Sequence, residues 1–103
     1  MQIVIKNNFM FKIKIVEIKK PKTDEPTYYI GRFFKHNDSI YKIYTVERGS
    51  FIVIWVTKSG KLDSTICGIT GSIGYLQKGV WKIVDRVDIS TELLNQLDSY
   101  DPY

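Results

Sequence analysis

The residue types that most often catalyse reactions are scarce in this chain. His36 is the only histidine and Cys67 the only cysteine, so His and Cys cannot supply the three or four ligands of a zinc site. His36 falls in an expected turn, where a histidine is usually solvated. Cys67 lies among apolar residues of an expected strand, which favours a buried thiol over a nucleophile. We therefore expect no catalytic residue, no metal site and no cofactor, and we predict that the protein is not an enzyme.

Three short motifs have part of the pattern of a known kind of site, and each is incomplete. Ser59-Gly60-Lys61 and the stretch 68–72 lack the four-residue gap and the Gly-Lys-Ser/Thr ending of a phosphate-binding loop. Glu17-Ile18-Lys19 has the carboxylate–x–lysine spacing of some metal nucleases. No acidic residue precedes it in the chain, so the motif predicts no nuclease site.

Aromatic rings and cations are interleaved between residues 28 and 44. One face of the strands that carry them must be core, whereas the other can offer rings for base stacking and cations for phosphates. Two interpretations stay open, because rings are also the commonest filling of a small β core. The candidate binding residues are Lys12, Lys14, Arg32, Lys35, Lys42, Arg48, Tyr29 and Tyr44.

The element that we expect to hold these residues in place is the apolar run at 51–56. Its six residues include four that are β-branched, and turn-like residues flank it on both sides. Six residues are too few for a stable helix or a membrane span. The run therefore predicts a strand in the middle of the fold with both of its faces covered.

Further strands are expected on both sides of this central one. Residues 2–5 and 9–19 alternate as two strands joined by a tight turn, with a change of phase near residues 15–16 that predicts a β-bulge. A polar loop follows at 20–26. Hairpins link strands at 27–35, 40–46, 51–56 and 62–70 into a meander, and a last strand lies at about 80–87. The glycines at 68, 71 and 74 predict strand distortion followed by a turn.

One helix is expected, at about residues 90–98. Ser90 can cap it, Glu92 suits its first turn, and Leu93, Leu94 and Leu97 form an apolar stripe. The tail 99–103 is expected to fray. The whole chain, 1–103, is expected to form a single domain of the mostly β class. We predict a small, strongly bent antiparallel sheet or an SH3/OB-like partly open barrel, with one short C-terminal helix.

The overall composition supports a β-rich protein with an uneven charge. The chain has 15 Ile and no Ala, which favours strands and also suggests an AT-rich coding sequence. Residues 1–61 carry 12 Lys/Arg against 5 Asp/Glu, whereas residues 62–103 carry 3 against 6. A basic front and an acidic tail can mark a surface for phosphate or an acidic partner, although lysine also commonly solvates exposed strands.

The single cysteine and the lack of a signal peptide or membrane span predict a cytoplasmic protein. The preferred function is a non-enzymatic, small basic interaction module. We expect it to be a virus- or mobile-element-encoded inhibitor that docks on a host protein or nucleoprotein complex. A homodimer through an exposed edge strand belongs to the same class. The alternative is a β module that binds nucleic acid directly through Lys/Arg and exposed aromatic rings.

Overall fold

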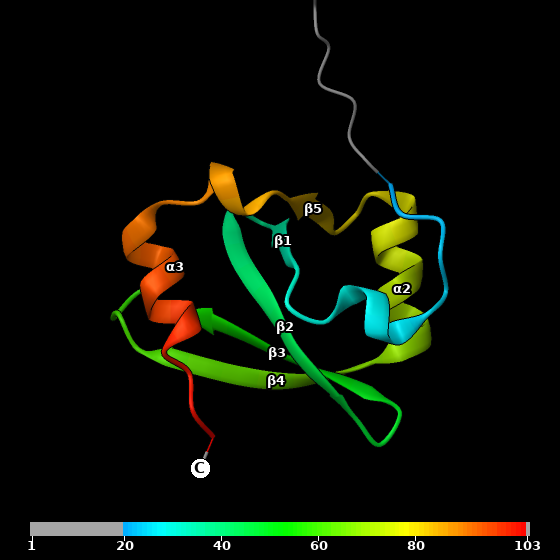
Figure 1. Ribbon diagram of the computed structural model, residues 1–103, viewed down its shortest axis with the longest axis horizontal. Helices are drawn as coiled ribbons and strands as arrows, with labels where there is room; N and C mark the ends of the chain where they lie inside the picture. The colour runs from blue at the N-terminus through cyan, green and yellow to red at the C-terminus, as the bar shows by residue number, and fades with distance from the viewer. Residues whose placement is uncertain (1–19, 103) are drawn as a thin grey trace, which may run out of the picture.

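The computed structural model describes residues 20–102, which form one open sheet of five antiparallel strands in the order β4-β3-β2-β1-β5. Figure 1 shows helices α2 and α3 at opposite ends of this sheet. In chain order the elements are η1 (Pro26–Tyr29), β1 (Phe33–His36), β2 (Ser39–Glu47), β3 (Ser50–Val56), β4 (Leu62–Gly68), α2 (Ile69–Lys78), β5 (Lys82–Val84), η2 (Arg86–Asp88) and α3 (Thr91–Asp98).

Strands β1 to β4 form the expected meander, and two of its turns follow from their sequence. Asn37 and Asp38 have φ values of 50° and 67°, and Arg48 and Gly49 have 50° and 76°. Two consecutive residues with positive φ suit the right-handed twist of a two-residue hairpin, and Asn, Asp and Gly tolerate that conformation best. The meander is confirmed, although β3 is an interior strand beside the outer strand β4, and β2 lies in the middle.

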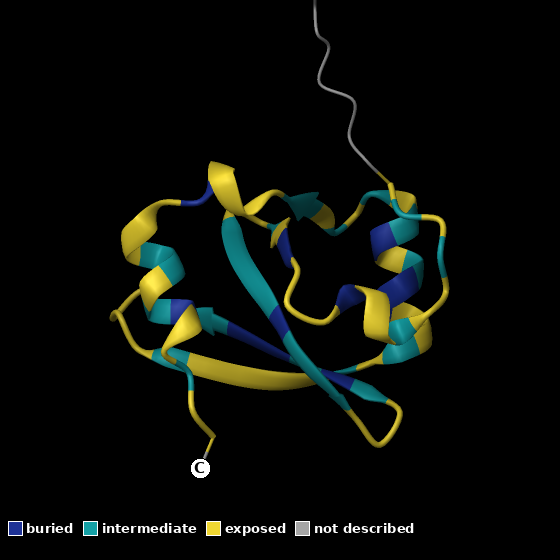
Figure 2. Cartoon of the chain, viewed as in Figure 1, coloured by how far each residue is buried: buried dark blue, intermediate teal, exposed yellow. Residues whose placement is uncertain are grey.

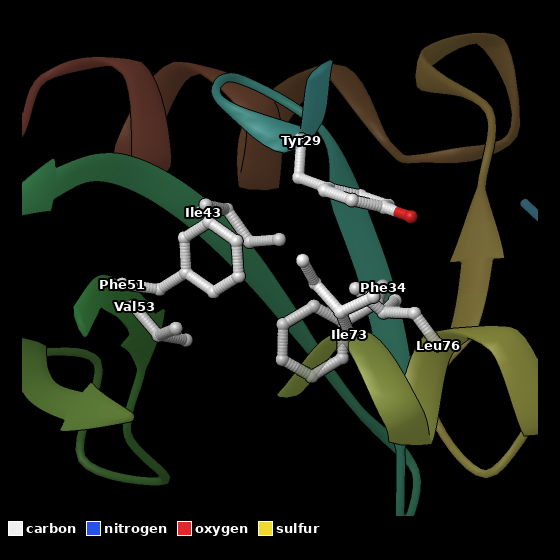
Figure 3. Close-up of a cluster of buried hydrophobic side chains, with 7 residues drawn as sticks. All are labelled: Tyr29, Phe34, Ile43, Phe51, Val53, Ile73 and Leu76. Atoms are coloured by element: carbon white, nitrogen blue, oxygen red, sulfur yellow. The ribbon is translucent and has the colours of Figure 1, made fainter. Parts of the chain in front are cut away.

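Both faces of β3 are covered, as the apolar run predicts. Phe51 and Val53 point to one side and Ile54 to the other, and none of the three is more than 1% exposed. Phe51 and Val53 belong to the core beneath α2, which Figure 3 shows, whereas Ile54 belongs to the core beneath α3. The sheet is therefore the middle layer between two helices. The core beneath α2 comprises Tyr29, Phe34, Ile43, Phe51, Val53, Ile73 and Leu76.

The C-terminal helix is confirmed almost residue by residue. Ser90 caps α3, because its Oγ accepts a hydrogen bond from the Leu93 N–H at 3.2 Å. Leu93, Leu94 and Leu97 all pack in the core beneath α3. The tail that was expected to fray from residue 99 is in part tied down, because the Tyr100 ring meets the Tyr44 ring edge-on at 5.0 Å.

The prediction for residues 68–74 is wrong, because helix α2 begins at Ile69. Gly71 and Gly74 disfavour a helix and Ile69, Thr70 and Ile73 favour strands, which is why the local pattern misled. The spacing of Ile69, Ile73 and Leu76 nevertheless puts all three on one helical face, and that face packs on the sheet. Burial of this face outweighs the weak helix propensity of the segment.

The fold class is correct only in part. The antiparallel sheet and the C-terminal helix are confirmed, whereas the barrel is wrong because β4 and β5 end the sheet without pairing with each other. With α2 and α3 on its two faces, the fold is mixed α/β and not mostly β. Residues 27–35 also divide into η1 and the short strand β1, and the last strand covers only Lys82–Val84. The strands expected at 2–5 and 9–19 lie outside the described residues.

Candidate functional site

Cationic side chains gather where β1 and β5 form one edge of the sheet. Lys35 of β1 and Lys82 of β5 are register partners, so their side chains stand on the same face directly opposite each other. Arg32 directly precedes β1, and Arg86 begins η2 just after β5. Lys20 lines a hollow together with Arg32 and Ile83. We call this group the basic edge, and it consists of Lys20, Arg32, Lys35, Lys82 and Arg86.

Three shallow hollows run along the basic edge. The largest, of about 510 Å³, is lined by Lys35, His36 and Lys82 together with Asn37, Asp38 and Val80. A second, of about 240 Å³, contains Lys20 and Arg32, and a third, of about 140 Å³, contains Arg32 and Arg86. Five cations and only two carboxylates, those of Asp38 and Asp85, line the three hollows. The edge therefore presents an excess of positive charge to solvent.

Neither of the two opposed lysines forms an ion pair within residues 20–102, although the Asp38 carboxylate lines the same hollow. The two ion pairs of these residues are Lys42–Asp98 and Arg86–Asp98, and neither involves Lys35 or Lys82. Like charges directly opposite each other on neighbouring strands destabilise a sheet by several tenths of a kcal/mol, on the order of what an attractive pair contributes. An anion bound between the two ammonium groups would remove this repulsion.

Arg32 and Tyr28 form a second feature of the basic edge. The guanidinium carbon of Arg32 lies 3.9 Å from the centroid of the Tyr28 ring, and Arg32 Nε donates a hydrogen bond to the Tyr28 carbonyl at 2.7 Å. This cation–π contact and the hydrogen bond fix the orientation of the guanidinium. The Tyr28 side chain stays 44% exposed. The guanidinium thus lies over one face of a partly exposed ring at the surface.

Asp98 binds two cations near this edge, Lys42 and Arg86, and Arg86 is itself a member of the basic edge. Its carboxylate accepts a hydrogen bond from Lys42 Nζ at 3.0 Å and another from Arg86, and both cations lie within 6 Å of the Phe33 ring. The hydrogen bonds from Arg86 and Lys42 hold the pKa of Asp98 below its usual value. The arrangement ties the C-terminal end of α3 to β2 and η2. Lys42 and Arg86 consequently have a structural partner and are less available to a ligand than Lys20, Arg32, Lys35 and Lys82.

The predicted binding residues are not all brought together. Arg32 and Lys35 lie on the basic edge, whereas Arg48 lies in the β2–β3 turn, at the other end of β2. Tyr29 is fully buried and donates a hydrogen bond from its hydroxyl to the Thr23 carbonyl at 2.5 Å, so its ring offers no surface to a ligand. Tyr44 packs against Tyr100. Lys12 and Lys14 lie outside the described residues.

Sequence reasoning missed Lys82 and Arg86. Lys82 alternates with Trp81 and Ile83 in the predicted last strand, so its exposure could have been foreseen from the period-2 pattern. The position of Lys82 opposite Lys35 could not have been foreseen, because β5 pairs with β1 across more than forty positions of chain and nothing local specifies that pairing. The cationic cluster arises from this long-range contact.

The groups that most often carry out catalysis remain isolated in the part of the chain that the structure describes. His36 Nε2 lies 3.2 Å from the Asn37 side-chain nitrogen and contacts no carboxylate or thiol. Burial raises the pKa of the Cys67 thiol, which disfavours the reactive thiolate at neutral pH. Between residues 20 and 102, no three His, Cys, Asp or Glu side chains are close enough to share a metal ion.

None of the helices in the described region has the length and apolar character needed to cross a membrane. In the comparisons with known proteins, no protein-family model, no curated protein and no solved structure matches the chain.

Proposed function

We propose that the protein is a non-enzymatic interaction module whose basic edge docks on an anionic partner, either an acidic protein surface or a nucleoprotein complex. The observation that carries this proposal is the pair Lys35 and Lys82, opposed on neighbouring strands with no ion-pair partner among residues 20–102. A carboxylate or phosphate that enters the adjacent hollow would contact both ammonium groups.

The remainder of the basic edge supports a macromolecular partner over a small one. The three hollows are shallow and lie on both sides of β1 and β5, so the positive charge is spread around the edge and is not gathered in one enclosed cavity. Small-molecule sites are usually enclosed and mostly apolar, whereas charges spread over a surface steer and orient larger partners. The small size and isoleucine-rich, alanine-free composition suit an inhibitor encoded by a virus or mobile element, acting on a host complex.

Direct binding of nucleic acid is the second candidate function, and the Arg32–Tyr28 pair is the observation that favours it. An exposed ring beside a guanidinium can stack on a base while the cation contacts the neighbouring phosphate. In this candidate function, purified nucleic acid would be sufficient as the partner. Docking on an acidic protein would require no nucleic acid at all.

The proposal is tested by fluorescence anisotropy with three probes: a poly-glutamate peptide, single-stranded DNA and double-stranded DNA. Binding of the double-stranded DNA through about three phosphate contacts should weaken roughly 40-fold when salt rises from about 50 to about 200 mM, and binding of the single-stranded DNA roughly 20-fold. The double substitution Lys35→Gln/Lys82→Gln should weaken binding at least about tenfold, because two charge-assisted contacts are lost. The matched control is Lys58→Gln/Lys61→Gln, which removes the same charge from the β3–β4 turn.

Each outcome assigns or removes a function. Binding to poly-glutamate alone supports docking on an acidic protein, whereas salt-sensitive binding to DNA alone supports the second candidate. If Lys35→Gln/Lys82→Gln and the control Lys58→Gln/Lys61→Gln lost affinity equally, net charge, and not the basic edge, would account for the binding. The absence of binding to all three probes at low salt would contradict the proposal.

A further inference from the structure

The two outer strands of the sheet differ sharply. β5 has three residues, one of them a lysine, and lies beside the cations of the basic edge. β4 has seven residues, and four consecutive ones, Asp63 to Ile66, are exposed. Figure 2 shows this exposure along most of β4. Within residues 20–102, β4 pairs only with β3, so its other side presents unpaired main-chain groups.

The main-chain groups that point outward from β4 can be identified from the hydrogen bonds at its two ends. Thr57 N–H bonds to the Lys61 carbonyl at 2.7 Å, and Ile69 N–H bonds to the Gly49 carbonyl at 3.3 Å. Both pairs continue the β3–β4 register, in which hydrogen-bonded pairs alternate with non-hydrogen-bonded ones. The odd-numbered residues of β4 therefore bond to β3. The even-numbered ones, Leu62, Ser64, Ile66 and Gly68, direct their N–H and C=O groups outward.

A side-chain contact supports this assignment independently. The Ser64 N–H bonds to the carboxylate of its own neighbour Asp63 at 2.8 Å, as expected of an amide that has no partner on β3. Ile66 is the next residue of β4 whose N–H points outward, and it is 72% exposed. An apolar side chain and an outward amide thus occupy the same exposed position.

The features that normally prevent edge-to-edge pairing are missing from β4. Natural edge strands are usually short, or carry lysine, proline or a bulge. β4 contains no Lys, Arg or Pro, and its register with β3 runs without a shift over seven consecutive pairs. Its one charged residue is Asp63, near one end. This edge is therefore suited to pairing with a further strand.

We infer that β4 pairs antiparallel with β4 of a second copy of the chain, around a twofold axis at Thr65. This register places Ser64 opposite Ile66 of the second copy and Leu62 opposite Gly68. All four outward residues of each strand then exchange main-chain hydrogen bonds. Thr65 faces its own equivalent, a favourable cross-strand pair.

The charge on β4 selects this register. With the axis at Thr65, the two Asp63 carboxylates lie about 13 Å apart, four residues along the strand direction. With the axis moved to Ser64, they become diagonal neighbours at about 7–8 Å and repel each other. An axis at Ile66 separates the carboxylates but leaves Leu62 without a partner. Pairing through one self-complementary strand is the isologous contact that a twofold dimer requires.

The dimer would place the two basic edges at opposite ends of one ten-stranded sheet. Nine inter-strand spacings of about 4.8 Å separate them by at most about 43 Å. Two such edges can engage one extended anionic partner together, which raises its apparent affinity. β4 and the basic edge lie at opposite edges of the sheet. Dimer formation therefore uses none of the residues of the basic edge, and it can be tested independently of the proposed function.

The inference is tested by light scattering coupled to size-exclusion chromatography, over a range of micromolar concentrations. The 12.0 kDa chain should elute with twice that mass. Ile66→Lys places a cation beside each outward amide at the centre of the interface and should raise the dimer dissociation constant at least about tenfold. The matched control is Val87→Lys in η2, which adds the same charge at an apolar side chain that is 89% exposed.

A second variant and a second measurement complete the test. Ser64→Pro removes an outward N–H that bonds only to Asp63, so the monomer should keep its circular dichroism spectrum while the dimer is lost. In the wild type, amide exchange at Ile66 and Gly68 should slow as concentration rises. A monomeric wild type, or a dimer that neither variant weakens, would overturn the inference. Slow exchange at these amides in a monomer would assign the edge to another segment of the same chain, and would also overturn it.

Discussion

Replacing Gly74 by alanine is expected to stabilise the protein by about 1 kcal/mol, although glycine is often retained for a structural reason. Gly74 lies in the middle of α2 (Ile69–Lys78), where glycine costs about that much relative to alanine because the unfolded chain is more flexible. Its φ is not positive, and a Cβ built on it meets no heavy atom within 4 Å. Nothing in the structure therefore opposes the substitution.

Gly79→Ala is the matched control and should act in the opposite direction. Gly79 ends α2 in the left-handed conformation, with φ 78°, and a Cβ there would lie 3.0 Å from Lys20 Cε. The left-handed conformation costs a non-glycine residue about 1–2 kcal/mol. The flexible lysine side chain can move away, so the backbone term should dominate. The same glycine-to-alanine change is thus expected to raise the free energy of unfolding at position 74 and to lower it at position 79.

The assay is urea unfolding followed by circular dichroism and by the fluorescence of Trp55 and Trp81. For a chain of this size, 1 kcal/mol corresponds to a shift of about 4–8 °C in Tm, which thermal melts resolve easily. If Gly74→Ala destabilised the protein while Gly79→Ala had no effect, residues 69–78 would not form a helix. The bent strand that the glycine spacing suggests would then be the better description.

Three further predictions concern the core, the ion pairs and the loop before η1. Ile54→Ala should cost about 2–5 kcal/mol in urea unfolding, because the side chain is fully buried in β3, and a loss below about 1 kcal/mol would contradict the doubly covered strand. Asp98→Asn should destabilise the protein by only about 1 kcal/mol at pH 7, because the Asp98 carboxylate is partly exposed and solvent weakens its ion pairs. Because its folded pKa lies below its unfolded one, the stability that Asp98 adds is present above the ordinary carboxyl pKa and is lost as pH falls through the folded value; a difference from wild type that persists in strong acid would refute this role. Tyr29→Phe should cost about 1 kcal/mol or less in thermal melts, because the Thr23 carbonyl keeps its bond from Gln77 Nε2 at 3.2 Å, and a larger loss would mean that this amide does not compensate.

The parts of the fold that the sequence predicted are those with strong local signals. The hairpin turns carry residues that tolerate positive φ, and the cap of α3 is a serine placed directly before an amphipathic helix. The run at 51–56 is apolar at every position because it has a helix on each side, and its pattern predicted that burial without revealing what covers it.

The errors arose where long-range packing outweighs local preference. Residues 69–78 form a helix because Ile73 and Leu76 are buried against the sheet. The glycine-rich sequence around these two residues does not predict that burial. Tyr29 was assigned to a binding face, but the turn of η1 places it in the core. Lys82 joined the candidate site only through the pairing of β5 with β1, which no local pattern specifies. A period-2 pattern shows which side chains share a face, but not which strand will lie beside them.

The central claim, that the basic edge is the contact surface, is tested most directly by amide hydrogen exchange with and without the anionic probe that binds best. Slower exchange is predicted in the segments 32–36 and 82–86, whose residues other than Phe34 line the three hollows of the edge, with no change in the β3–β4 turn at 57–61. Protection centred on the β3–β4 turn, with none at β1 or β5, would contradict the account.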